Sequence, residues 1–188
     1  MKKNVLITGA GPIGCMAAAV CKHAGAKTVI ITDINDYRLN LAKNLGADVL
    51  VNPTTQDLSK ILNELNLKNN LKVGLEMSGN PIAFNDMLKS LSHGANVSLL
   101  GLLPNHTTID WSHIIFKGLT VKGIYGREMY ETWYKMSADA PPISSALASL
   151  PSTLLSLLGR VPAGDRVRGG DRPALALPGD LGRWGRSD

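Results

Sequence analysis

The chain has 188 residues, of which 44% are hydrophobic and 19% are charged, and its formal net charge is +5. This length and composition favour one globular domain with at most a tail, and they exclude a largely disordered chain. The lysines are scattered along the sequence rather than gathered into a stripe with aromatic residues, so we expect neither nucleic acid nor a membrane as a partner.

The two cysteines, Cys15 and Cys21, lie in one apolar stretch and form neither a C-x-x-C nor a Cys–His pattern. They therefore predict neither a disulfide framework nor a zinc site, and they are compatible with a reducing compartment. The run from Val5 to Cys21 superficially resembles a signal peptide, but its glycines and proline disfavour an apolar helix. We interpret this run as a strand, a turn and a helix, and we expect a cytoplasmic protein.

Short β-branched runs alternate with helical patterns between residues 4 and 126, which is typical of a parallel α/β sheet. The predicted strands are Asn4–Thr8, Thr28–Thr32, Asp48–Val51, Val73–Met77, Ala95–Leu100 and Thr120–Tyr125. The predicted helices are Ile13–Ala24, Asp36–Leu45, Gln56–Leu65, Pro81–Leu91 and Trp111–Phe116. Residues suited to helix ends flank them, namely Gly25, Gly46, Thr54, Thr55, Asn80 and Asp110. We expect an α/β Rossmann fold, a doubly wound sheet of six parallel strands in the order 3-2-1-4-5-6.

The composition changes abruptly near residue 138. Lysine, asparagine and isoleucine are frequent before it, whereas all six basic residues after it are arginine and six of the ten prolines lie there. Lysine, asparagine and isoleucine have AT-rich codons, whereas arginine and proline have GC-rich codons. This change indicates a frame-shifted or chimeric ending. We predict a folded domain over residues 1–138 and a low-complexity, disordered tail over residues 139–188. A flexible interaction tail is the competing interpretation.

The sequence Gly9-Ala10-Gly11-Pro12-Ile13-Gly14 matches the pattern G-x-G-x-x-G and connects the first predicted strand to the first helix. In dinucleotide-binding folds the first glycine makes a tight turn, and the second lets the backbone approach the pyrophosphate. The third lets the helix pack closely on the sheet, and the amide groups at the start of that helix attract phosphate. The alternative interpretation is a tight turn between strand and helix that binds no ligand.

Asp33 follows the second predicted strand, nineteen residues after Gly14. An acidic side chain at this position accepts hydrogen bonds from ribose hydroxyls and repels the 2′-phosphate of NADP, so we predict NAD as the cofactor. Arg38 tempers this prediction, because an arginine nearby can bind that phosphate. With Asp33 present, we expect Arg38 to flank the adenosine instead.

Five segments carry a family resemblance, at residues 9–14, 31–39, 74–79, 116–119 and 123–129. They resemble the zinc-dependent L-threonine 3-dehydrogenases of the medium-chain dehydrogenase/reductase superfamily. The resemblance covers residues 3 to about 138, and Glu131-Thr132-Trp133-Tyr134 is specific to these enzymes rather than to the superfamily. The intact enzyme of that family is a homo-oligomer that oxidises L-threonine to 2-amino-3-ketobutyrate and reduces NAD, and the resemblance implies that this chain is the NAD-binding part of such an enzyme. It also implies NAD contacts from Ile13, Asp33 and Arg38, and contacts at the nicotinamide end from Leu100, Gly101, Leu102, Ile124 and Tyr125.

In that family a preceding domain supplies cysteine, histidine and acidic ligands to a catalytic zinc. We expect this chain to lack that domain, because it begins at the first predicted strand and its four histidines share no ligand spacing. The resemblance thus implies a catalytically incomplete NAD-binding fragment, without catalytic or metal-binding residues of its own. Two alternatives stay open: a non-catalytic NAD-binding module or split-enzyme subunit, and a fragment of a polyol or alcohol dehydrogenase.

Overall fold

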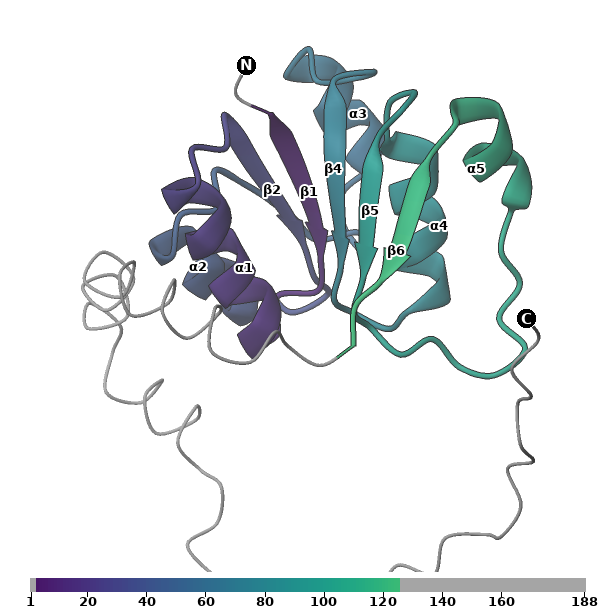
Figure 1. Ribbon diagram of the computed structural model, residues 1–188. Helices are drawn as coiled ribbons and strands as arrows, with labels where there is room; N and C mark the ends of the chain where they lie inside the picture. The colour runs from purple at the N-terminus through teal and green to yellow at the C-terminus, as the bar shows by residue number, and fades with distance from the viewer. Residues whose placement is uncertain (1–2, 126–188) are drawn as a thin grey trace, which may run out of the picture.

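A six-stranded parallel sheet organises the computed structural model, which describes residues 3–125 (Figure 1). Its strands are β1 (Asn4–Thr8), β2 (Thr28–Thr32), β3 (Val49–Val51), β4 (Leu71–Glu76), β5 (Asn96–Leu99) and β6 (Thr120–Gly123). The helices are α1 (Pro12–His23), α2 (Asp36–Asn44), α3 (Leu58–Glu64), α4 (Pro81–Ser90) and α5 (Trp111–Lys117). The strand order is β3-β2-β1-β4-β5-β6, which confirms the predicted Rossmann topology.

The pleat of the central strands divides the core into two apolar clusters. Val5 and Ile7 of β1 face one side of the sheet, where they pack with buried residues of α1 and α2. Leu6 lies between them, faces the other side and packs with buried residues of α3 and α4. Because helices cover both faces, every side chain of β1 and nearly every side chain of β2 is buried, as expected for such continuous apolar runs.

A glycine in β4 sets the depth at which α4 packs on the sheet. A Cβ atom at Gly74 would lie 2.7 Å from Sδ of Met87 and 3.1 Å from Cδ1 of Leu91. A side chain at this position would force Met87 and Leu91 to move. The N-terminus of α4 lies at the other end of the helix, at the edge of the sheet formed by the carboxyl ends of the strands.

The predicted elements all occur, β1 and β2 have the predicted ends, and no end differs from the prediction by more than two residues. β4 begins at Leu71 rather than at Val73, because Leu71 is fully buried and pairs with Asn4 of β1. The last strand, predicted over Thr120–Tyr125, ends at Gly123. Within residues 3–125, no helix is long and apolar enough to cross a lipid bilayer.

The predicted cap of the third helix is wrong. The helix α3 begins at residue 58, so its N-cap is residue 57 and not Thr54 or Thr55. The carboxylate of Asp57 caps this helix by accepting the N–H groups of Ser59 at 2.8 Å and Lys60 at 3.3 Å. Both threonines instead form hydrogen bonds within the preceding turn.

The predicted tail over residues 139–188 lies outside the described residues. The predicted domain boundary near residue 138 and the family-specific segment at residues 131–134 lie outside them as well.

Candidate functional site

A cleft of about 470 Å³ opens at the carboxyl ends of the strands. It is lined from the loops that follow β1, β2, β3 and β4, together with the first turns of α4. The order of the strands reverses between β1 and β4, and open α/β sheets bind their ligands at this point. Four residues predicted to contact the cofactor line the cleft, namely Gly9, Gly11, Asp33 and Arg38.

The glycine turn after β1 forms one wall of the cleft. Gly9 has a φ angle of 90°, which favours glycine, and its N–H donates to the carbonyl oxygen of Thr32 at 2.8 Å. A Cβ atom at Gly14 would overlap the carbonyl oxygen of Gly9, so α1 lies directly against the turn. At Gly11, by contrast, a Cβ atom would meet no other atom within 4 Å. The chain's own packing therefore requires Gly9 and Gly14 but leaves open space at Gly11.

The N-terminus of α1 is open to a ligand. Gly11 is its N-cap, and no side chain accepts the amide groups of its first turn. Pro12 and Ile13 begin the helix, and the Ile13 side chain is exposed. The other four described helices each have an Asn or Asp side chain as their N-cap. The unpaired amide groups and partial positive charge of α1 suit an anion such as a pyrophosphate.

Asp33 follows β2 and turns its carboxylate toward the glycine turn. Its Oδ2 accepts the N–H of Ala10 at 2.7 Å, and its Oδ1 accepts the N–H of Asn35 at 2.9 Å. Each carboxylate oxygen has a second lone pair that a ribose hydroxyl can use. The ligand role of Asp33 stays a prediction, whereas its bond to the glycine turn is a structural role that the motif did not indicate. Arg38 is exposed on α2 and lines the same cleft.

Much of the cleft lining comes from residues that the sequence motifs did not indicate. They include Ile34, Pro53, Thr54, Leu58, Met77, Ser78, Asn80, Ile82, Ala83 and Asp86. Ile34 is 72% exposed and Ile82 is 73% exposed, so the cleft offers apolar surface to a ligand. Most of these residues follow a strand or begin the next helix. The rule that ligands bind at the carboxyl ends of parallel strands could have found them.

The residues predicted for the nicotinamide end lie apart from this cleft. Leu100, Gly101 and Leu102 follow β5, and Ile124 and Tyr125 follow β6, at the same carboxyl edge of the sheet. None of the five lines the cleft. Leu102 is 93% exposed and Tyr125 is fully exposed. The structure thus brings Gly9, Gly11, Asp33 and Arg38 to one cleft. Pro12, Ile13 and Gly14 do not line this cleft, and the positions predicted for nicotinamide lie on an open edge.

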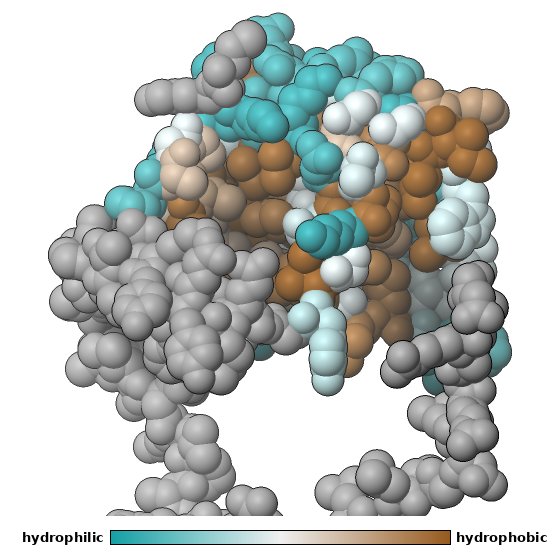
Figure 2. All heavy atoms as spheres, in the orientation of Figure 1, coloured by the Kyte–Doolittle hydropathy of each residue, from teal (hydrophilic) through white to brown (hydrophobic). Residues whose placement is uncertain are grey.

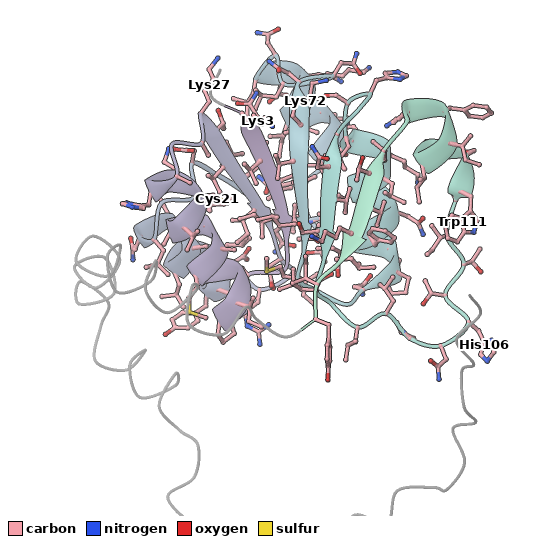
Figure 3. The ribbon with its side chains drawn as sticks, viewed as in Figure 1. Lys3, Cys21, Lys27, Lys72, His106 and Trp111 are labelled. Carbon is pink, nitrogen blue, oxygen red and sulfur yellow. The ribbon has the colours of Figure 1, made fainter. Side chains whose placement is uncertain are left out.

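Lysine side chains do not gather at the cleft. Lys3, Lys27 and Lys72 lie at the amino ends of the strands, at the opposite edge of the sheet (Figure 3). Lys22 on α1 is paired with Asp48 at 2.8 Å. Within the described residues, the charged side chains that line the cleft are Asp33, Arg38 and Asp86. An anion would therefore be held there by backbone amides and Arg38.

The thiol of Cys15 packs beneath the glycine turn. The side chain is buried, and its Sγ–H donates to the carbonyl oxygen of Ala10 at 3.4 Å. Burial, and to a lesser degree the charge of Asp33, raises the pKa of Cys15 to about 11. Burial also raises the pKa of Cys21. Both thiols are therefore protonated at neutral pH and are poor nucleophiles.

Comparison with known proteins places this fold and cleft in a family. A sequence profile described as zinc-binding dehydrogenase matches residues 12–140, more than half of the chain. The chain belongs to the zinc-binding dehydrogenase family. An L-threonine 3-dehydrogenase of Chromobacterium violaceum is 60% identical to this chain over 136 residues, which are 72% of this chain and 40% of the relative. The chain thus spans about 40% of the length of the curated relatives it matches.

Solved structures share the fold of this zinc-binding dehydrogenase domain. L-idonate 5-dehydrogenase of Escherichia coli matches with a TM-score of 0.62 and 26% identity, over 82% of this chain and 40% of that one. A protein described as a short-chain alcohol dehydrogenase of Escherichia coli CFT073, solved with NADH, matches with a TM-score of 0.60 and 28% identity. That match covers 65% of this chain and 36% of the other.

The family name implies zinc, which requires about four closely placed nitrogen, sulfur or oxygen ligands. Within residues 3–125, no three His, Cys, Asp or Glu side chains come together in a way that could hold a metal ion. His113 and Asp110 approach each other at 3.4 Å at the start of α5, without a third ligand. The described residues do not fit a zinc centre, and no step proposed below depends on one.

Proposed function

We propose that the cleft binds NAD. The pyrophosphate lies over Gly11 at the open N-terminus of α1, and the adenosine ribose lies beside Asp33. The nicotinamide extends toward Leu100–Leu102 and Ile124. The observation that carries this proposal is the open space at Gly11, directly before an uncapped helix and in the same cleft as the Asp33 carboxylate. Backbone amides then meet the phosphates while the carboxylate accepts the ribose hydroxyls.

The charges of the cleft favour NAD over NADP. The carboxylate of Asp33 would lie against the additional 2′-phosphate of NADP, and the two negative charges would repel each other. Arg38 is the one cation in the described lining and would reduce this repulsion. Because Asp33 is tied to Ala10 at 2.7 Å, the carboxylate is held near the phosphate-binding turn and cannot easily move aside.

Titration of the full chain with NAD and with NADP tests the cofactor proposal. We expect tighter binding of NAD, and we expect Asp33→Ala to weaken NAD binding by about 10- to 100-fold, as for the loss of charged hydrogen bonds. Because Asp33 also holds Ala10, Asp33→Asn is the matched variant, which keeps one carbonyl acceptor for the turn and removes the charge. It should bind NADP better relative to NAD than the unaltered chain does. Equal affinities of the unaltered chain for both cofactors would contradict the role of Asp33.

We further propose that this NAD-binding unit serves an L-threonine 3-dehydrogenase. Such an enzyme oxidises the β-hydroxyl of L-threonine to a ketone, giving 2-amino-3-ketobutyrate, while hydride passes to NAD. The 60% identity over 136 residues supports this choice. A polyol dehydrogenase is the second candidate, supported by the weaker 26% identity to L-idonate 5-dehydrogenase. In either case the residues described here bind and orient the cofactor.

Exchange of the matched segment tests the choice between these two candidates. Residues 3–138 of this chain would replace the corresponding segment of the Chromobacterium violaceum threonine enzyme and, separately, of the Escherichia coli idonate enzyme. We expect the first chimera to keep a turnover rate within about tenfold of its parent, since 60% of the exchanged residues are identical. The second should lose far more activity. Equal retention in both hosts, or greater retention in the idonate host, would contradict the threonine assignment.

A further inference from the structure

Glu76, the last residue of β4, has a carboxylate that is completely buried. Its Oε1 accepts hydrogen bonds from the N–H of Ser78 at 2.9 Å, the hydroxyl of Ser78 at 2.5 Å and the N–H of Gly79 at 3.0 Å. The hydroxyl of Thr8, at the end of β1, lies 3.4 Å from the same oxygen. Within residues 3–125 the carboxylate has no ion-pair partner. The hydrogen-bond donors of the turn that follows β4 therefore stabilise this buried carboxylate.

That turn supports the glycine turn of the cleft. Gly9 packs against the backbone of Ser78 so closely that a Cβ atom at Gly9 would lie 2.9 Å from Cα of Ser78. Ser78 and Asn80 also line the cleft. By fixing Ser78, the carboxylate of Glu76 fixes the surface on which the proposed pyrophosphate-binding turn lies.

Glu76 also contacts the loop after β5, through its backbone carbonyl and through one carboxylate oxygen. A Cβ atom at Gly101 would overlap Oε2 of Glu76 and the amide nitrogen of Gly79. The backbone carbonyl of Glu76 accepts the N–H groups of Leu100 at 3.0 Å and Gly101 at 3.1 Å. A Cβ atom at Gly79 would lie 2.8 Å from the carbonyl oxygen of Leu102. Glu76 thus joins the turn after β4 to the loop proposed for the nicotinamide.

We propose that Glu76 is a positioning residue for the dinucleotide, because its carboxylate holds the turn after β4 and its backbone carbonyl holds the loop after β5. This inference rests on the proposed binding of NAD. AMP would bind mainly at Asp33, Ile34 and Arg38, and the hydrogen bonds of Asp33 and Arg38 do not involve Glu76. AMP would have one phosphate at the glycine turn and nothing at the loop after β5. The loss of the carboxylate should therefore affect the whole dinucleotide more than AMP.

Glu76→Gln is the most informative substitution, since it preserves size and removes the charge. One carboxylate oxygen becomes an NH₂ group, which is a donor and cannot accept a hydrogen bond from the N–H groups of the turn. Gly79 donates to both oxygens, at 3.0 and 3.3 Å, so it would face a donor in place of one acceptor. The amide oxygen can keep the bonds made at the Oε1 position, and the new NH₂ group then lies at the Oε2 position, against the N–H of Gly79 and beside Gly101. We expect the turn and Gly101 to shift away from this donor.

Titration of the full chain with NAD and with AMP tests this inference. We expect Glu76→Gln to weaken NAD binding about tenfold and AMP binding less than about threefold. Leu67→Ala is the control for a general loss of stability, because Leu67 is buried just before β4 and far from the cleft. It should weaken NAD and AMP binding equally or leave both unchanged. Equal weakening of NAD and AMP by Glu76→Gln would overturn the positioning role.

A second variant changes Gly101, the residue that lies against the carboxylate of Glu76. Gly101→Ala places a methyl group against the carboxylate and should give the same selective loss of NAD binding. The same methyl group also meets the amide nitrogen of Gly79, so Glu76→Ala in the same chain would not relieve the contact. A loss of AMP binding equal to the loss of NAD binding in Gly101→Ala would overturn the inference. Failure of the unaltered chain to bind NAD would overturn the proposed function itself, whereas normal binding by both single variants would overturn the role of Glu76 alone.

Discussion

At the scale of single residues, the glycines of the turn after β1 differ in what they do for the chain itself. Gly14 is needed by packing, because any side chain would overlap the carbonyl oxygen of Gly9. Gly11 has nothing within 4 Å of its missing side chain and a φ angle of −67°, which any residue adopts. The folded chain therefore gives no reason for a glycine at position 11. A ligand that approaches the backbone closely does give one.

Two alanine variants separate these roles. Gly14→Ala should lower the free energy of unfolding by about 1–3 kcal/mol, the usual cost of overpacking, because α1 must move away from the turn. Gly11→Ala should lower it by no more than about 1 kcal/mol, the usual preference for glycine over alanine at an N-cap, because its methyl group meets open space. The same variant should weaken NAD binding at least about tenfold. Urea unfolding and NAD titration of both variants check this, and similar losses of stability in the two would contradict the distinction.

At the scale of elements, the N-terminus of α1 differs from the N-termini of the other described helices in having no side-chain cap. Asn35, Asp57, Asn80 and Asp110 each accept amide groups at the start of their own helix. These four helices begin with their donors satisfied by the chain. α1 begins at Gly11 and Pro12 with no side-chain acceptor. Among the described helices, α1 is thus the one whose first turn is prepared for an external anion.

Removal of one structural cap gives a prediction at this scale. Asp57→Ala should lower the free energy of unfolding by about 0.5–2 kcal/mol, because it removes the acceptor for Ser59 and Lys60. Thr55→Ala is the matched control on the same exposed turn and should change it by less than about 0.5 kcal/mol. Thermal unfolding of the two variants tests this. A larger loss from Thr55→Ala would restore the threonine cap that the sequence suggested.

At the scale of the whole molecule, the sheet is covered unevenly. β1 is buried along its length, whereas β6 forms an edge of the sheet and is exposed along its length. Figure 2 shows apolar atoms at the surface over the strands and at α5, where Ile115 and Phe116 are more than 70% exposed. Exposed edge strands are commonly paired or covered. The homo-oligomer implied by the family resemblance, with β6 as its contact, stays a prediction.

Sequence patterns predicted the fold of the described residues closely and the cleft in part. The strand order follows from alternating strands and helices, because right-handed crossovers allow few arrangements of such units. Gly9, Gly11 and Asp33 were found because they belong to a compact motif. Ile82 and Asn80 were missed as cleft residues, because an apolar residue and a helix cap have common structural explanations and no motif marks them.

By itself, the sequence determined the order of the elements and the glycine turn, because periodicity and glycine spacing are properties of neighbouring residues. Only the tertiary structure decided which glycine faces open space and which acidic residue supports the cleft. Thr8 and Glu76 are 68 positions apart in the chain, and they meet because β4 pairs with β1. Asp33 reaches the glycine turn because β2 pairs with the other side of β1. Contacts of this kind depend on strand pairing across the sheet, which no local pattern of residues records.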